Sequence, residues 1–543
     1  MSSQNEAKKK QQKQILLAGG LVVAGLVSAY MIYKHQQNKS LIKANEASIG
    51  IDLDDEKETK EMELTDDNCC IKSSDILYST PMNAFMNGKR EKVMYVTCTR
   101  TDQTPKGQDF IAVVNVDPHS DQYCQIIKEI NVGVGEEVHH SGWNACASCF
   151  GCNDVERKYL VVPSFVSGNI HFIDVKKQEL KHTVSGKYIK EKYGLSFPHT
   201  PHCLKDGNIL ISFLGDDGSK NSKGLDFLLI NGKTFEIKGR YIDSNSKRPN
   251  FGYDYWYQPY FNIMISSEWG KPKAFSKGFD LNDVKNGLYG NSIHLWEFNT
   301  GKLIKTIEFD KSEVIMPLET RFLHNPKKGH AFIGCALTSN MIHIYYDEYS
   351  KDWKTNSKYI VVEPIKVDNW VLPEMPALIT DFLISMDDKY IYFANWLHGD
   401  VRQYDISDVF NPKLVGQVFV GGLLKHGSPY KINKNETILK TAPKIPNING
   451  SIIGGGPQMM QLSLDGKRLY ITNSLYSAYD KQFYPDLLKN GGQIILIDCD
   501  HKNGGMKLNE SFMIDFGKSI NGPARPHEMR YPGGDCTSDI YLP

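Results

Sequence analysis

Histidines and cysteines are concentrated in one short segment, residues 138–152, with the sequence VHHSGWNACASCFGC. Its cysteines follow one another at three-residue intervals: Cys146, Cys149 and Cys152. Imidazole nitrogens suit copper, zinc or iron, and thiolates suit copper(I) and zinc. On a regular strand the adjacent His139 and His140 would point to opposite faces, so joint metal ligation requires a turn, which Gly142 permits. Ordinary packing is the alternative, because a single Cys-x-x-Cys pair is only moderately specific for zinc.

Four further histidines lie beside glycine, proline or aspartate rather than inside apolar strands: His199 and His202 in PHTPHC, His398 in NWLHGD and His527 in PHEMRYPGGD. Taken singly, each is more often an ordinary polar loop residue. In a β-propeller, however, such loops meet at one end of the central channel, where distant segments can supply ligands to one ion. Their shared setting therefore favours one common metal site.

Two carboxylates accompany these histidines. Glu528 directly follows His527, and Asp400 comes two residues after His398. We expect each to orient a histidine ligand from behind or to accept a proton during catalysis. The alternative for both is a solvated loop carboxylate.

The remaining cysteines indicate no disulfide scaffold. Eleven cysteines in 543 residues are too few for one, and the odd number leaves at least one without an intrachain partner. Cys69 and Cys70 are adjacent. We expect Cys203, Cys335 and Cys499 to be inert core residues.

From about residue 76 onward, short apolar runs alternate with glycine, asparagine and aspartate turns, which predicts an all-β fold of antiparallel sheets. Residues 385–395 (SMDDKYIYFAN) are echoed by residues 463–473 (SLDGKRLYITN). That offset of 78 residues would span two propeller blades of roughly 40 residues each. A β-propeller is therefore the predicted architecture, with a two-sheet sandwich as the alternative. Residues 425–457 resemble an insertion.

The N-terminal region differs from the rest of the chain. A basic tail, residues 1–14, precedes the uncharged segment 15–33, which is long enough to cross a bilayer as a helix. Residues 34–75 are expected to be an acidic, flexible linker to a domain over residues 76–543. These features predict a single-pass membrane protein and leave open which side the domain faces. A cleaved signal peptide, which would make the protein secreted, is the alternative.

The overall charge argues against one class of function. Lysine plus arginine (63) equals aspartate plus glutamate (63), so the formal net charge is zero. A nucleic-acid-binding protein would be expected to show a basic excess, so we expect no nucleic-acid partner. The sequence contains no Gly-x-Ser-x-Gly motif and no His-Glu-x-x-His motif, so a hydrolase has little support.

Long motifs distributed from Tyr78 to Ile540 give the chain a family resemblance. They are YSTP at 78–81, DQYC at 121–124, HHSGWN at 139–144, GYDYWYQP at 252–259, RFLHN at 321–325, LPEMP at 372–376, NWLHGD at 395–400, GPQM at 456–459, YSA at 476–478 and RYPGGDC at 530–536. In this set and order, the chain resembles the selenium-binding protein/methanethiol oxidase family.

The resemblance implies a seven-bladed β-propeller. In the enzymatic members, copper held by histidines supports oxidation of methanethiol by dioxygen and water to formaldehyde, hydrogen sulfide and hydrogen peroxide. The matching positions here are His139, His140, one of His199 and His202, and His527, with His398 as a further candidate. Selenium attachment in the family maps to Cys124. Two departures are the adjacent Cys69 and Cys70, where animal relatives have Cys-x-x-Cys, and the hydrophobic N-terminal segment.

Three functional hypotheses follow. The first is a membrane-tethered, copper-dependent methanethiol oxidase, and the retained histidine motifs favour it. The second is a non-enzymatic propeller scaffold that binds selenium or soft metals through Cys124, Cys146 and Cys149 and contacts other proteins by its loops. The third is a store of zinc or copper without turnover. Sequence does not decide between copper and zinc, because clustered imidazoles accept both.

Overall fold

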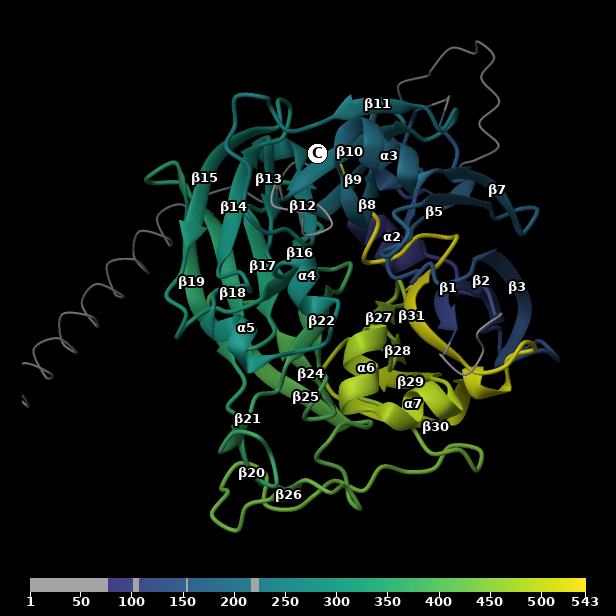
Figure 1. Ribbon diagram of the computed structural model, residues 1–543, viewed down its shortest axis with the longest axis vertical. Coiled ribbons are helices and arrows are strands. Elements are labelled where there is room, and N and C mark those ends of the chain that lie inside the picture. The colour runs from purple at the N-terminus through teal and green to yellow at the C-terminus, as the bar shows by residue number, and fades with distance from the viewer. Residues whose placement is uncertain (1–76, 101–106, 153–154, 216–223) are drawn as a thin grey trace, which may run out of the picture. The chain divides into compact units, whose positions relative to one another are not determined.

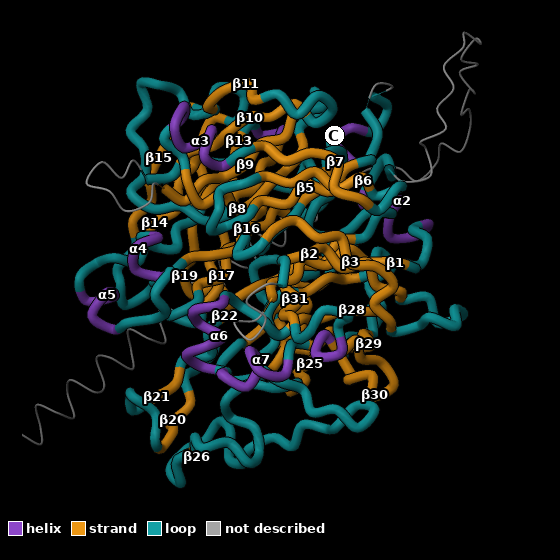
Figure 2. Tube along the Cα trace, turned by 45° about the vertical axis from the view of Figure 1, so that its right-hand side comes forward, coloured by secondary structure: helices purple, strands orange, loops and turns teal. Residues whose placement is uncertain are grey.

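The computed structural model describes residues 77–100, 107–152, 155–215 and 224–543 (Figure 1). Within these residues, strands dominate and helices are short (Figure 2). The strands are runs of β-branched and aromatic residues, such as YLVVP at Tyr159–Pro163, and these residue types pack well on a pleated surface. The described residues belong to one compact unit, Cys69–Pro543.

Seven four-stranded antiparallel sheets make up most of this unit. The first contains β1 Val93–Arg100, β2 Asp109–Asn115, β3 Gln125–Gly133 and β31 Ala524–Arg530. The second contains β4 Gly142–Trp143, β5 Tyr159–Pro163, β6 Ile170–Asp174 and β7 Glu179–Val184. The third contains β8 Ser196–Cys203, β9 Asn208–Gly215, β10 Asp226–Asn231 and β11 Ile237–Arg240. The fourth contains β12 Tyr255–Gln258, β13 Ile263–Ser266, β14 Ser292–Glu297 and β15 Lys302–Glu308.

The remaining sheets follow in chain order. The fifth contains β16 Pro317–Phe322, β17 His330–Cys335, β18 Asn340–Asp347 and β19 Asp352–Val361. The sixth contains β22 Ile379–Ile384, β23 Tyr390–Asn395, β24 Asp400–Asp405 and β25 Lys413–Phe419. The seventh contains β27 Met460–Leu462, β28 Arg468–Thr472, β29 Gln493–Cys499 and β30 Met506–Asp515. A small three-stranded sheet contains β20 Ile365–Asp368, β21 Glu374–Met375 and β26 Lys431–Ile432.

The last strand of the chain completes the first sheet. β31 pairs antiparallel with β1, with Tyr95 opposite Arg530, and Figure 1 shows the yellow β31 beside the purple β1. First strands of successive sheets also contact one another, as in β4 with β8, β12 with β16, β22 with β27 and finally β27 with β31. This all-β arrangement is consistent with the predicted propeller, because a sheet shared between the two ends of the chain closes the ring.

The internal repeat marks neighbouring sheets rather than sheets two positions apart. Residues 385–395 end in β23 and residues 463–473 contain β28, and these are the second strands of the sixth and seventh sheets. The spacing is twice the expected length because the connection from Phe419 to Met460 is inserted between them. The interpretation of the offset as two blades was therefore wrong.

The helices are short connections between strands. They are α2 Pro81–Asn87, α3 Gly186–Tyr193, α4 Pro272–Phe275, α5 Leu281–Lys285, α6 Ser477–Phe483 and α7 Pro485–Asn490, with 3-10 turns η1 Ala147–Cys149, η2 Pro259–Phe261 and η3 Phe516–Lys518.

The predicted membrane-spanning helix and the single-pass membrane location must be corrected. In the described part of the chain, no helix is both long and apolar enough to cross a membrane. The longest, α3, has 8 residues. It therefore extends for about 12 Å, against roughly 30 Å of hydrocarbon to be crossed. The segment 15–33, to which the prediction was assigned, lies outside the described residues.

Candidate metal centre

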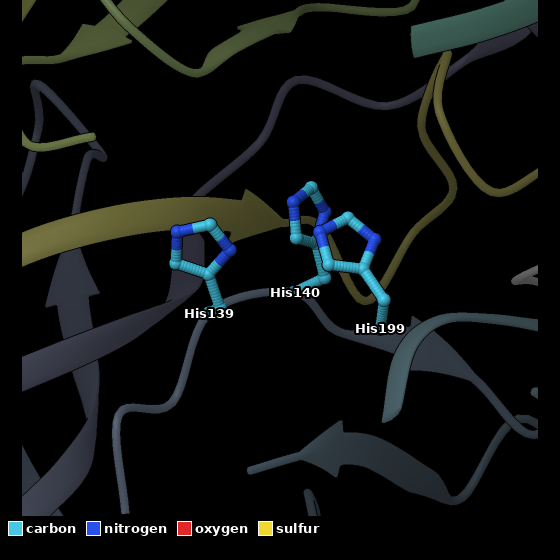
Figure 3. Close-up of side chains that lie close together, drawn as sticks. All are labelled: His139, His140 and His199. Atoms are coloured by element: carbon cyan, nitrogen blue, oxygen red, sulfur yellow. The ribbon is translucent and has the colours of Figure 1, made fainter. Parts of the chain in front are cut away.

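Three histidine side chains meet in the interior: His139, His140 and His199 (Figure 3). One ring nitrogen from each can be chosen so that all three lie within 4.8 Å of one another, and all three residues are buried. His139 and His140 belong to the connection between β3 and β4, whereas His199 lies in β8 of the next sheet. The site therefore joins two sheets.

The two adjacent histidines share one site because their segment is not a regular strand. Val138 forms only an isolated bridge to Ser164, and residues 139–141 are not paired in a sheet before β4 begins at Gly142. Strict alternation of side chains is thereby relieved, and the centroids of the two rings lie 5.0 Å apart. The turn expected near Gly142 is not seen, because Gly142 begins β4 directly after these unpaired residues.

Gly142 has a second role, which is steric. A Cβ atom at this position would lie 2.3 Å from the carbonyl oxygen of Pro201 in β8. Glycine therefore lets β4 and β8 approach closely. Where the two strands come close, the ring centroids of His140 and His199 are only 3.9 Å apart.

A fourth histidine comes from the far end of the chain. His527 lies in β31, and its ring stacks on that of His139 with centroids 3.6 Å apart. Its backbone carbonyl accepts a hydrogen bond from the Thr472 hydroxyl at 2.7 Å. His527 therefore joins the cluster because β31 returns to pair with β1.

Each of these four rings has one nitrogen held by a protein group. The pairs are His139 Nε2 with the Leu475 carbonyl (2.6 Å), His140 Nδ1 with Glu528 Oε1 (3.1 Å), His199 Nδ1 with Thr200 Oγ1 (2.9 Å) and His527 Nδ1 with the Ser474 carbonyl (2.7 Å). The opposite nitrogens are buried without a hydrogen-bond partner: His139 Nδ1, His140 Nε2, His199 Nε2 and His527 Nε2. A ring whose N–H is donated to a carbonyl or carboxylate presents a lone pair at its other nitrogen, as metal-ligating histidines do.

Burial keeps these histidines neutral. Desolvation lowers the pKa of His139 and places the pKa values of His140, His199 and His527 well below the usual value. For His140, His199 and His527 the neighbouring histidines lower the pKa further, because a second positive charge nearby would be repelled. Neutral imidazole is the form that binds metal ions.

Glu528 supports the site from behind His140. Its Oε1 accepts from the His140 ring and from Arg530 Nη2 at 2.6 Å, and its Oε2 accepts from the backbone N–H and the hydroxyl of Ser141. Burial raises the pKa of the carboxyl group, while Arg530 and the Ser141 hydrogen bonds oppose that effect. With both oxygens engaged, Glu528 fixes the orientation of the His140 ring.

Aromatic rings enclose the histidines on other sides. Phe165 stacks against His139 at a centroid distance of 5.6 Å, and Tyr476 meets the same ring edge-on at 6.1 Å. Tyr253 lies 4.2 Å from the ring of His199, and Trp269 packs behind Tyr253 at 5.6 Å. An apolar wall of this kind excludes water and strengthens electrostatic interactions inside the site. The sequence prediction included none of the four, although Tyr253 and Tyr476 lie in the quoted motifs GYDYWYQP and YSA.

His202 lies in the same strand as His199 but has different neighbours. Its ring lies 4.8 Å from Trp256 and 5.2 Å from Tyr255. Among the described residues, the group of three converging histidines includes His199 from β8 and does not include His202.

His398 and Asp400 lie in and beside β24 of the sixth sheet. His398 Nε2 hydrogen bonds to the Met375 carbonyl at 2.9 Å. Asp400 accepts from Arg402 Nε at 2.9 Å and from Gln417 Nε2 at 2.6 Å, and Gln417 is on the neighbouring strand β25. The His398 contact reaches β21 of the three-stranded sheet, and the Asp400 contacts stay within the sixth sheet. Neither residue is among the histidine-cluster contacts of the described chain.

Cys124 lies at the opposite edge of the first sheet from His527. It occupies the turn before β3 with a φ of +64°, and the strand order β3-β2-β1-β31 separates it from β31 by the width of the sheet. Its partly exposed thiol borders a cavity of about 310 Å³, and partial burial raises its pKa. A selenium site there would be separate from the histidine cluster.

Comparison with known proteins identifies close relatives. A family model described as 56 kDa selenium binding protein matches residues 72–542. The chain is 49% identical over 479 residues to selenium-binding protein 1 of Arabidopsis thaliana, covering 87% of this chain and 96% of that protein. It is 47% identical over 470 residues to a human protein named methanethiol oxidase, covering 86% and 98%. A Xenopus laevis methanethiol oxidase is 48% identical with the same coverage.

A solved structure has the same fold. The hypothetical selenium-binding protein from Sulfolobus tokodaii superimposes with a TM-score of 0.74 at 33% sequence identity, over 86% of this chain and 99% of that one. The family resemblance inferred from the sequence motifs is thus confirmed.

Proposed function

The chain belongs to the 56 kDa selenium-binding protein family, and from this premise we propose that it is a methanethiol oxidase that holds copper in its histidine cluster. The reaction converts methanethiol, dioxygen and water into formaldehyde, hydrogen sulfide and hydrogen peroxide. Relatives named methanethiol oxidase that match over 86% of this chain support the enzymatic role and a small thiol as substrate.

One observation supports a metal ion in the histidine cluster, and copper is proposed because the oxidation requires a redox-active ion. Four buried imidazole nitrogens, on His139, His140, His199 and His527, lack any hydrogen-bond partner. Leaving one buried polar atom unsatisfied costs roughly 1–3 kcal/mol. The rings of His140, His199 and His527 lie 5.0, 5.8 and 3.6 Å from the ring of His139. Metal ligation in this cluster would account for the unpartnered atoms. An all-imidazole donor set suits copper.

The protein's own residues position the histidine rings and exclude water from the site. Bound copper would supply one-electron redox chemistry and lower the pKa of a thiol ligand. Glu528 holds the His140 ring in position, and the carbonyls of Ser474 and Leu475 do the same for His527 and His139. The aromatic wall around Phe165 keeps bulk water away and offers an apolar surface to a small methyl thiol.

The deciding experiment uses the full chain, loaded with copper or treated with a chelator. We expect methanethiol to yield sulfide and peroxide in equal amounts only when copper is bound. The His140→Ala variant should lose both turnover and stoichiometric copper, because it removes a ligand and leaves Glu528 without its ring partner. A folded, copper-loaded chain that releases neither product would exclude the oxidase.

The second candidate is a non-enzymatic selenium-binding protein. The partly exposed Cys124 thiol beside its cavity favours it, and the Arabidopsis relative is named for selenium binding. Selenite-treated chain should then retain selenium by mass spectrometry, and Cys124→Ser should lose it. Retention in that variant would exclude Cys124 as the site.

A further inference from the structure

A group of three thiols lies apart from the histidine cluster and plays no part in the proposed oxidation. Cys146 precedes η1 and Cys149 is its last residue, in the connection from β4 to β5, and Cys203 ends β8 in the next sheet. They are 1%, 1% and 2% exposed, respectively, and none forms a disulfide. Cys203 is a buried core residue, as expected from the sequence, and it lies beside the other two thiols.

The Ser148 hydroxyl lies at the centre of the group. Its Oγ is 3.2 Å from Cys146 Sγ and 3.9 Å from both Cys149 Sγ and Cys203 Sγ. The Cys149 thiol also contacts the Leu204 carbonyl at 3.5 Å, which places it against the residue that follows Cys203. The three sulfur atoms therefore surround one small polar side chain at the junction of two sheets.

The electrostatics separate the roles of two of these thiols. A hydrogen bond with Cys203 lowers the pKa of Cys149 to about 7, with further lowering by Ser148 and by the Arg157 guanidinium. Burial and the neighbouring thiols raise the pKa of Cys203. A lowered pKa raises the share of thiolate at neutral pH, and the thiolate is the reactive form. Burial alone instead raises the pKa of the isolated Cys335.

A cavity adjoins this group, although none of the three cysteines lines it. It has a volume of about 430 Å³ and is lined by residues that include Ser148, Leu204 and Tyr257. Two of these lining residues contact the thiols directly. Hydrogen peroxide is small enough to enter this cavity and diffuse the short distance to the thiols, whereas bulkier oxidants should react more slowly.

We infer that Cys149 and Cys203 form a peroxide-reactive dithiol that closes to a disulfide between the second and third sheets. The Cys149 thiolate attacks one peroxide oxygen, the O–O bond breaks, and a sulfenic acid and, after protonation, one water are formed. Cys203 then attacks the sulfenic sulfur, the S–S bond forms, the S–O bond breaks, and the hydroxyl leaves with the thiol proton as a second water. Two sulfur atoms thus supply the two electrons that reduce hydrogen peroxide. The inference does not rest on the proposed oxidase, because peroxide from any source serves.

The test is peptide mapping of the full chain after graded peroxide treatment and alkylation. Trypsin cleavage after Lys128, Arg157, Lys192 and Lys205 places Cys149 and Cys203 in different peptides, residues 129–157 and 193–205. We expect these two peptides to become disulfide-linked, and the link to disappear on reduction. Cys152 shares the first peptide and is partly exposed, so it reports on ordinary surface oxidation.

Matched variants distinguish this mechanism from non-specific oxidation. Cys203→Ser should leave a sulfenic acid on Cys149 that dimedone traps, whereas Cys149→Ser should abolish both the trapped species and the link. Cys335→Ser should leave linking unchanged, and Cys149 should oxidise at least tenfold faster than Cys335. The inference is overturned if Cys203 remains alkylatable under excess peroxide. It is also overturned if the only disulfide lies within peptide 129–157, or if a chelator-removable metal protects the three thiols.

Discussion

At the scale of single residues, the candidate centre depends on how each imidazole is held. Each of the four rings uses one nitrogen for a hydrogen bond to the protein and leaves the other without a partner. Three of those hydrogen bonds go to a backbone carbonyl or a hydroxyl, and the fourth goes to the carboxylate of Glu528. Substitutions at the groups behind the rings should therefore affect the centre without removing a ligand.

Glu528→Gln tests that positioning role. The amide keeps the size of the side chain but loses the charge that faces the His140 ring and Arg530. We expect copper affinity to fall about 10–100-fold, as is typical when an orienting partner is lost. Equilibrium copper titration with a competing chelator measures this. Asp400→Asn is the control, since its partners Arg402 and Gln417 lie within the sixth sheet, and it should keep wild-type copper affinity. Unchanged affinity and turnover in Glu528→Gln would remove the role.

His199 and His202 offer a matched pair in one strand. His199 belongs to the nitrogen cluster, whereas His202 packs between Tyr255 and Trp256. His199→Ala should weaken copper binding by at least about 100-fold, because losing a ligand costs more than losing an orienting partner. His202→Ala should lower the unfolding midpoint but leave copper stoichiometry intact, which metal analysis of the folded fraction would show. The reverse pattern would place the ligand at His202.

At the scale of elements, the centre depends on how closely two sheets approach. β4 supplies the chain that follows His139 and His140, and β8 carries His199. The segment before β4 contributes two histidines to the cluster and β8 contributes one, so the three-histidine group requires both segments. Their separation is set at Gly142, where the backbone of one strand meets the Pro201 carbonyl of the other.

Gly142→Ala should disturb both stability and the centre. The new methyl group would lie 2.3 Å from the Pro201 oxygen, so one strand must shift. Such overpacking typically costs about 1–3 kcal/mol of unfolding free energy. We expect a lower denaturation midpoint together with reduced copper binding. Gly533→Ala is the control, since its Cβ would meet nothing within 4 Å, and equal effects of both substitutions would refute the steric argument.

At the scale of the whole molecule, the two ends of the folded domain meet in one sheet. β31 carries His527 and Glu528 and pairs with β1 near the start of the described chain. The return of the C-terminal strand therefore both closes the ring of sheets and completes the candidate centre. Loss of this closure would remove one histidine and the carboxylate together.

The stability of the whole fold should decline in acid partly through a histidine pair in the fifth sheet. His330 Nδ1 and His343 Nε2 lie 3.0 Å apart, and burial lowers their pKa values from 6.5 to about 4 and about 3. The unfolded chain therefore takes up these protons at a higher pH than the native chain. The stability associated with neutral histidines is thus fully present above about pH 6.5 and is lost progressively as the pH falls towards 3–4.

Denaturant titrations of the wild type and His343→Gln across pH 7 to 4 measure this contribution. We expect the unfolding free energy of the wild type to fall more steeply, by about 1 kcal/mol per pH unit. His182→Gln serves as a control for loss of a histidine in another sheet. Parallel curves for wild type and His343→Gln would show that the pair titrates normally in the native state.

The sequence by itself determined the family, the all-β class and the residue types of the candidate centre. Alternating apolar strands and turn residues are local properties, and the paired histidines and the Glu528 beside His527 are visible along the chain. The order and spacing of residues within motifs such as HHSGWN can be identified without knowledge of the fold.

Only the tertiary structure decided which of these residues meet. His199 rather than His202 faces the cluster, His398 and Asp400 lie in another sheet, and Cys203 joins Cys146 and Cys149. The physical reason is that contacts between sheets depend on strand direction, bulges and close approaches. These arise when residues hundreds of positions apart pack together, and no local pattern encodes them. The inserted connection before β27 misled the blade count for the same reason, since length along the chain does not measure position in the ring.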